Sequence, residues 1–253
     1  MIVLLAGVFF ILLLLIGQDK GIDILWTLLW NFVTFLSMVF LINLTGNVIV
    51  VTILACVIVS MLTLFFQNGY NIKTKAAFLS VVIVVLVNII IIYCVTTLAN
   101  IQGFGSEYLD INESYGYLGT INISMTSIAI SMALTGLIGA IIDTALSISS
   151  AGYEIYVTGS FKEIKPLFVS CMNVGKDILG TTINTLFFIF SGDCFTLMLF
   201  YSKTSSFAQV INSKIFKQEV LFILYSTLGC IMIIPVTAII SSYAYISIAQ
   251  SED

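Results

Sequence analysis

The chain has no histidine and no arginine, and only 9% of its 253 residues are charged. Soluble domains are about 25% charged, so this chain is not built to face water. Without histidine it cannot form Ser–His or Cys–His catalytic pairs or the usual zinc sites. The nine lysines and a net charge of −4 do not supply the basic surface that nucleic-acid binding needs.

Two further absences narrow the chemistry. The five cysteines are scattered inside apolar runs and form no CxxC pair, which is typical of buried small apolar residues. No GxxxxGK[ST] pattern occurs, so the chain is not itself an ATPase of the P-loop class. We therefore expect no metal site and no cofactor.

Hydrophobic residues make up 60% of the chain, and the mean hydropathy is +1.15. Apolar runs recur along the whole length, several of them near the roughly 20 residues that a helix needs to cross a bilayer. They do not alternate apolar and polar residues as membrane strands would. The sequence therefore predicts an all-α polytopic transmembrane helical bundle. We expect a single transmembrane domain over residues 1–253 and no soluble domain.

The apolar runs predict about seven hydrophobic segments. Turn residues at 43–47 divide the long uncharged stretch after Asp23 into two of them. The expected segments cover residues 2–16, 24–42, 48–66, 76–98, 121–154, 178–201 and 220–246.

The sixth segment is irregular in sequence. Its apolar run from Ile178 to Phe190 is shorter than a full span, and Ser191-Gly192-Asp193 interrupts it before the run resumes at Cys194. Breaks of this kind mark substrate and ion sites in transporters. We expect a discontinuous or re-entrant helix here, although a full crossing remains an alternative.

The lysines predict the orientation of the chain in the membrane, because cytoplasmic loops carry an excess of basic residues. With Lys73 and Lys75 in the cytoplasm, helix alternation also places Lys162 and Lys165 there, and the acidic loop 103–117 outside. If the sixth segment crosses, the lysines after residue 202 lie outside. If it is re-entrant they lie inside, as the lysine rule prefers.

One predicted helix carries a polar stripe. At helical spacing the following residues share one face: Gly136, Ala140, Asp143, Ser147, Ser150 and Glu154. A carboxylate at membrane depth is costly, so Asp143 is either a proton- or cation-binding group facing a cavity or half of a structural pair, for example with Lys176. Glu154 lies nearer the cytoplasm and is either part of the same path or an ordinary interfacial carboxylate. Gly136, Gly139, Ala140 and Ala151 allow close helix packing.

A second polar stripe follows Pro166. Asn173, Asp177, Thr181 and Asn184 recur at steps of four, four and three, and Lys176 adjoins them. These residues either line a path or form interhelical hydrogen bonds. Asp193 adds a second intramembrane aspartate, which admits an intramembrane aspartyl protease as a remote alternative. The glycine and the Pro-Ala-Leu motif that such a protease needs are missing.

Several motifs resemble the YibE/F-like family of bacterial membrane proteins. Residues 68–77 (NGYNIKTKAA) are similar to that family's HGFNRKTLAA, and residues 136–145 (GLIGAIIDTA) to its GALGAIxDxA. Residues 175–186, with GKD and NTL at their ends, are similar to GRDxxxxxxNTL. The match to the final GxxGxxxxxPxT is partial. Lys176 stands where the family usually has arginine.

The resemblance implies a shorter-type member in the bacterial plasma membrane, without the extracytoplasmic region of longer relatives. It also implies membrane lipid and a second YibE/F-like subunit or a homo-oligomer as partners. We expect a permease subunit of unknown substrate, with a path past Asp143, Glu154 and the Asp177–Asn184 stripe. The alternative is a non-transporting receptor or scaffold that binds extracellular ligands through loop 103–117.

Overall fold

The computed structural model describes the chain except for residues 99–123, 160, 162, 203–206 and 253. Within the described residues the regular elements are all helices, and six helical segments are long and apolar enough to cross a membrane. These six and the shorter apolar helix Ile2–Gln18 account for the seven expected hydrophobic segments. The predicted all-α polytopic architecture is therefore confirmed.

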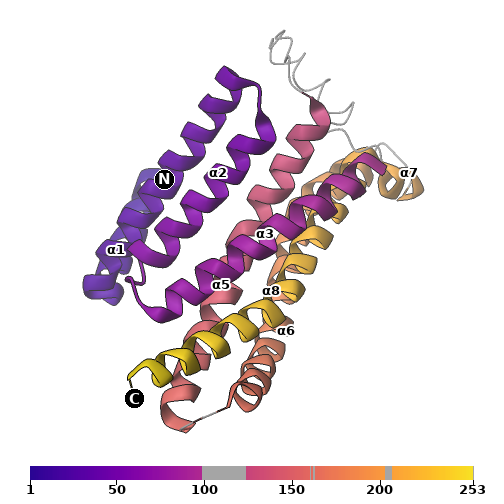
Figure 1. The fold of residues 1–253 in the computed structure, drawn as a ribbon. Helices are drawn as coiled ribbons and strands as arrows, with labels where there is room; N and C mark the ends of the chain where they lie inside the picture. The colour runs from indigo at the N-terminus through magenta and orange to yellow at the C-terminus, as the bar shows by residue number, and fades with distance from the viewer. Residues whose placement is uncertain (99–123, 160, 162, 203–206, 253) are drawn as a thin grey trace.

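The helices form an antiparallel bundle with two distinct ends (Figure 1). The end that we call the Lys20 end holds the α2–α3 turn, the end of α5, the start of α6 and the C-terminus. In chain order the elements are α1 (Ile2–Thr45), α2 (Val48–Met61), the π-helical η1 (Leu62–Phe66), α3 (Ile72–Leu98), α5 (Met125–Gly159), α6 (Ile164–Ser202), α7 (Phe207–Asn212) and α8 (Lys214–Glu252).

A sharp reversal divides α1. Gln18 has a left-handed φ of 48°, and the chain turns back there, so that Ile2–Gln18 precedes the span Lys20–Thr45. Gly21 makes the reversal sterically feasible, because a Cβ at that position would lie 2.6 Å from the Leu13 carbonyl oxygen. The first expected segment is thus a short helix folded next to the first full span.

The α2–α3 turn at the Lys20 end is fixed by reciprocal capping. The Asn71 side-chain oxygen accepts a hydrogen bond from the Thr74 backbone N–H at 3.0 Å, and the Thr74 hydroxyl accepts one from the Asn71 N–H at 3.1 Å. Gly69 takes the positive φ of 77° that the turn requires. These bonds satisfy backbone donors that the first turn of α3 would otherwise leave unpaired.

The core of the bundle is built around α5, which contacts α2, α3, α6 and α8. The span in α5 is the most buried of the six, and its inward side supplies fully buried residues that include Leu137, Ile141, Ala145 and Ile148. By contrast, the span in α6 has the lowest mean hydropathy, 1.3, and only 6% of its most apolar window is buried. α6 is therefore both the most polar and the most open span.

The expected break in the sixth segment does not form. α6 is one continuous helix through Ser191, Gly192 and Asp193. The Ser191 hydroxyl is satisfied inside the helix, since it donates a hydrogen bond to the Phe187 carbonyl at 2.8 Å. A single interior glycine costs a helix only about 1 kcal/mol. α6 runs from one end of the bundle to the other, so the re-entrant interpretation is wrong and α8 returns the C-terminus to the Lys20 end (Figure 1).

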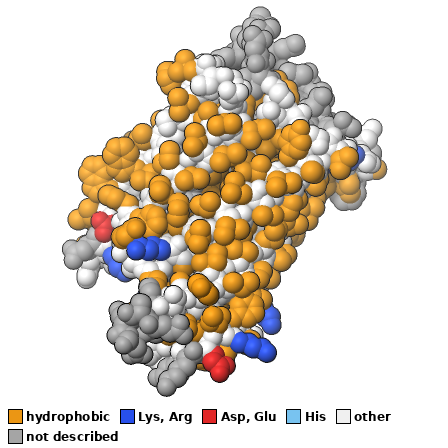
Figure 2. Space-filling view, in the orientation of Figure 1, with side chains coloured by type: hydrophobic (Ala, Val, Ile, Leu, Met, Phe, Trp, Pro, Cys, Tyr) orange, Lys and Arg blue, Asp and Glu red, His pale blue; other side chains and the backbone are white. Residues whose placement is uncertain are grey.

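The face formed by α1, α2, α3 and α8 is suited to lipid contact. Figure 2 shows it as a nearly continuous hydrophobic surface, with most of its charged side chains along the lower edge at the Lys20 end. Large apolar side chains are exposed along these helices, for example Leu28, Leu54, Leu86 and Ile239. Lipid tails can cover such a surface, because it exposes few polar groups that need hydrogen bonds.

Candidate functional site: the outward face of α5 and α6

The predicted polar stripe of α5 lies on the outside of the single chain. Gly136, Gly139, Asp143, Ser147 and Glu154 are exposed, while Ala140, Ser150 and Ala151 are partly exposed. The opposite side of the helix faces the core. The helix therefore confirms that these residues share a face, and that face opens away from the core of the bundle.

Asp143 lies near the middle of its helix. At a rise of about 1.5 Å per residue it is about 27 Å from Met125 and about 24 Å from Gly159 along α5. Since the hydrocarbon core is about 30 Å thick, the carboxylate lies deep in it. Within the described residues the side chain makes no hydrogen bond and no ion pair. The charge of Asp143 also acts on the Cys230 thiol of α8.

The glycines of the bundle fall into two groups. A Cβ added at Gly152 would lie 2.7 Å from the Cys171 sulfur, and one at Gly175 would lie 2.4 Å from Ile234, so these glycines permit close helix contacts inside the chain. A Cβ at Gly136, Gly139 or Gly180 would meet nothing within 4 Å. No neighbour within the chain explains the outward glycines.

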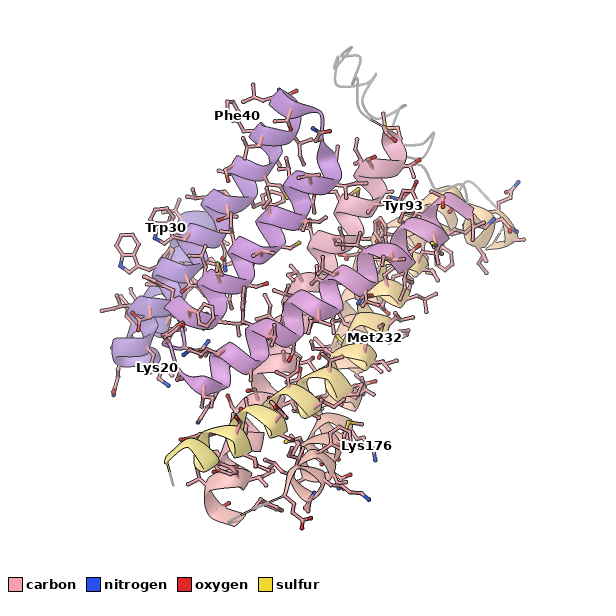
Figure 3. All side chains as sticks on the ribbon, viewed as in Figure 1. Lys20, Trp30, Phe40, Tyr93, Lys176 and Met232 are labelled. Carbon is pink, nitrogen blue, oxygen red and sulfur yellow. The ribbon has the colours of Figure 1, made fainter. Side chains whose placement is uncertain are left out.

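The predicted stripe of α6 is also exposed. Asn173, Asp177, Thr181 and Asn184 all point outward, and the Thr181 hydroxyl donates to the Ile178 carbonyl at 2.8 Å. Lys176 projects away from the bundle (Figure 3). No ion pair joins Asp143 to Lys176 in the described part of the chain, so the structural pair that the sequence suggested is not made within one chain.

Glu154 lies at the Lys20 end and has a partner that the sequence did not indicate. Its Oε1 accepts a hydrogen bond from Lys73 Nζ at 2.9 Å, and the same ammonium lies 4.4 Å from the centre of the Tyr153 ring. Next to this pair, the Ser149 hydroxyl donates to the Lys73 carbonyl at 2.8 Å, and Tyr245 donates to the Ser149 carbonyl at 2.7 Å. The cluster joins α3, α5 and α8 at one end of the stripe.

The structure does not bring Asp143 and Asp193 together. Asp193 acts electrostatically on Glu219 near the start of α8, whereas Asp143 acts on Cys230. Glu219 and Cys230 are about 16 Å apart along the helix axis. An aspartyl protease needs two carboxylates that share a proton, and these two residues do not provide that geometry. Among the described residues, no group of three or more potential metal ligands occurs.

Sequence reasoning missed the polar groups buried between α2, α3, α5 and α8. Asn88 is completely buried, and its Nδ2 donates to the Val84 carbonyl at 3.0 Å while its Oδ1 has no partner. A buried bond of 2.6 Å joins Thr52 of α2 to Ser131 of α5. The sequence could have indicated Asn88 as a buried polar residue, because it is the one amide side chain inside the apolar run 76–98.

An apolar groove continues the α5 stripe toward the end opposite Lys20. It has a volume of about 980 Å³ and lies between the second half of α1 and the start of α5. Gly136 contributes to both the groove and the stripe. Loop 103–117, which the receptor alternative requires, lies outside the described residues.

The fold and this face together define an all-helical, multi-pass membrane protein with an intramembrane carboxylate on its outer surface. The sequence model of the family described as YibE/F-like protein matches residues 5–247, nearly the whole chain. The chain therefore belongs to that family, as its motifs indicated. No curated protein and no solved structure matches it.

Proposed function

We propose that the protein is a membrane permease subunit whose substrate path follows the outward face of α5 and α6. The observation that carries the proposal is Asp143, a carboxylate at membrane depth without a hydrogen bond or ion pair in the described chain. Ionisable groups within membrane spans are costly, and they mark ion paths and proton relays.

The rest of the stripe supports a path of this kind. Ser147 and the partly exposed Ser150 follow Asp143 toward the Lys20 end, where Glu154 is paired with Lys73. On α6, Asp177, Thr181 and Asn184 present oxygen and nitrogen atoms at comparable depth. Asp193 lies farther along α6, toward the opposite end. Such side chains can replace the hydration shell of a proton or cation as it crosses.

The coupling role of Asp143 is testable in vesicles. Purified protein is reconstituted into liposomes that contain a pH-sensitive dye, and the outside is acidified. Wild-type protein is expected to carry protons faster than empty liposomes, and Asp143→Asn to fall to the empty-liposome rate. Glu163→Gln is the matched control, because Glu163 is an exposed carboxylate just before the α6 span.

Gradients of Na⁺ and K⁺ across the same vesicles, read with ion-sensitive dyes, test the cation alternative. Flux of none of the three ions, or equal flux through wild type and Asp143→Asn, would overturn the coupling proposal. A correctly inserted variant is required for either conclusion, and protease protection of the reconstituted chain supplies that check.

We also infer a bacterial plasma-membrane location with the Lys20 end in the cytoplasm. Lys20, Lys73, Lys75 and Lys165 belong to that end, as the excess of lysine on cytoplasmic loops requires. Lys214 and Lys217, at the start of α8, belong to the other end and are exceptions. A green fluorescent protein fused to the C-terminus should fluoresce, whereas a periplasm-dependent phosphatase in the same place should stay inactive.

A further inference from the structure

The outward face of α5 and α6 is poorly suited to contact with lipid. α6 is the most polar and least buried of the spans, and its exposed side carries Asn173, Asp177, Thr181 and Asn184. α5 adds the unpaired Asp143. Lipid tails offer no hydrogen bonds to such groups, and each one left unsatisfied in hydrocarbon is costly. The large apolar side chains that α6 does expose, such as Phe187, Phe188 and Ile189, lie mostly beyond Asn184, so the polar part of the face is the first half of α6.

The glycines on this face indicate what covers it. An interior glycine costs a helix about 1 kcal/mol relative to alanine, yet Gly136, Gly139 and Gly180 have open space at their Cβ positions. Gly136 and Ala140 have the spacing of four between small residues that lets the backbone of another helix come close. Because no helix among the described residues does so, a helix of another chain is the natural occupant.

The charges on the face are complementary to one another. Asp143 lies about 24 Å from the Lys20 end of α5, and Lys176 about 18 Å from the start of α6. A lysine side chain can span the difference of about 6 Å. Neither group has an ion-pair partner among the described residues. One chain thus carries an acidic and a basic side chain on the outward sides of two neighbouring helices. The two side chains do not form an ion pair with each other.

We propose that a second copy of this chain packs against the outward face, so that Asp143 of each copy meets Lys176 of its partner. A two-fold axis along the membrane normal keeps both copies in the same orientation and makes the contacts reciprocal, as in other isologous interfaces. Both pairs then form at matched depth, and Gly136 and Gly139 lie under a partner helix. The interface deepens the proposed function, because it supplies the missing second wall of the path, but the dimer itself is detectable without any transport.

Charge exchange tests the pairing directly. Full-length chains carrying donor or acceptor fluorophores on C-terminal tags are diluted into liposomes, and energy transfer is measured. Wild type should show transfer above random proximity. Asp143→Lys chains alone and Lys176→Asp chains alone should lose it, because like charges then face each other. A mixture of the two variants should regain it, because both pairs are opposite in sign in the mixed dimer.

A steric variant tests the same face without altering charge. Gly139→Leu should abolish energy transfer, whereas Gly7→Leu should preserve it, because both glycines have open Cβ positions but only Gly139 is on the face. Transfer unaffected by Gly139→Leu, or no transfer in wild type, overturns the interface. If Gly139→Leu acts but the charge mixture fails to recover, the Asp143–Lys176 pairing is overturned. Energy transfer reports the dimer whether or not the protein carries ions, so failure of the interface and failure of the proposed transport are read separately.

Discussion

Gly229 of α8 lies against Asn88 of α3 in the middle of the bundle. A Cβ on Gly229 would be 3.6 Å from the Asn88 amide nitrogen and 2.8 Å from the tip of Ile141 on α5. The glycine thus lets α8 pack closely against both α3 and α5. The Asn88 side chain at this contact is completely buried. The Oδ1 atom of that amide has no hydrogen-bond partner.

The unpaired Oδ1 leads to a prediction for Asn88. Asn88→Leu removes a buried polar group of similar size and should leave the free energy of unfolding unchanged or raise it by about 1 kcal/mol. Asn88→Asp places a carboxylate at the same site and should destabilise the protein strongly. A thiol-reactive dye in a thermal ramp reads both in a Cys94→Ser background, because Cys94 is exposed whereas Cys56, Cys171 and Cys230 are buried in the folded chain. Equal losses in the two variants would mean that Oδ1 has a partner such as water.

The two groups of glycines on α6 give a matched pair of substitutions. Gly175→Ala should lower stability by about 1–3 kcal/mol, because its Cβ would be 2.4 Å from the Cγ2 methyl group of Ile234, which the branched side chain cannot easily move away. Gly180→Ala should leave the single chain as stable or slightly more stable, since alanine is the better helix former. The measurement is the thermal unfolding of each variant as a monomer in detergent. A loss for Gly180→Ala equal to that of Gly175→Ala would contradict the open space found at residue 180.

The buried hydroxyl of Ser149 also has a measurable role. It donates to the Lys73 carbonyl and lies 2.7 Å from the Tyr245 hydroxyl and 3.3 Å from the Ser241 hydroxyl. Ser149→Ala should lower stability by about 1 kcal/mol, a typical size for a hydrogen bond inside a membrane protein. Ser150→Ala is the control, because Ser150 is partly exposed and has no bond to another helix. Equal melting temperatures of the two variants would count against a stabilising cluster.

Much of the fold could be predicted because lipid leaves few choices. Apolar runs of span length must be helical, so the number and order of the segments followed from the sequence. The error at Ser191-Gly192-Asp193 arose because small polar residues suggest a break, although a serine that donates to the carbonyl four residues back fits within a helix. Whether such a segment breaks depends on its neighbours, and these are not visible in the sequence.

The sequence predicted which residues share a helix face, but not what each face contacts. Helical periodicity placed Asp143 and Ser147 on one side of α5 and Asp177 and Asn184 on one side of α6, as the structure has them. Periodicity cannot say which side of a helix faces its own bundle, because a polar stripe suits a cavity and a subunit contact equally well. The Lys73–Glu154 pair was hidden for a related reason: its members are far apart in sequence and meet only through the packing of α3 on α5.

The same pair gives a final prediction, which separates Glu154 from Asp143. The Lys73 and Glu154 side chains are 26% and 69% exposed, so water and salt screen their attraction. Glu154→Gln should therefore lower stability by less than about 1 kcal/mol, with a smaller effect at high salt. Proton flux should remain, because Lys73 already holds this carboxylate at the end of the stripe, whereas Asp143→Asn should abolish flux. The double exchange Lys73→Glu with Glu154→Lys should restore the lost stability. Loss of flux in Glu154→Gln with intact stability would instead make Glu154 part of the path.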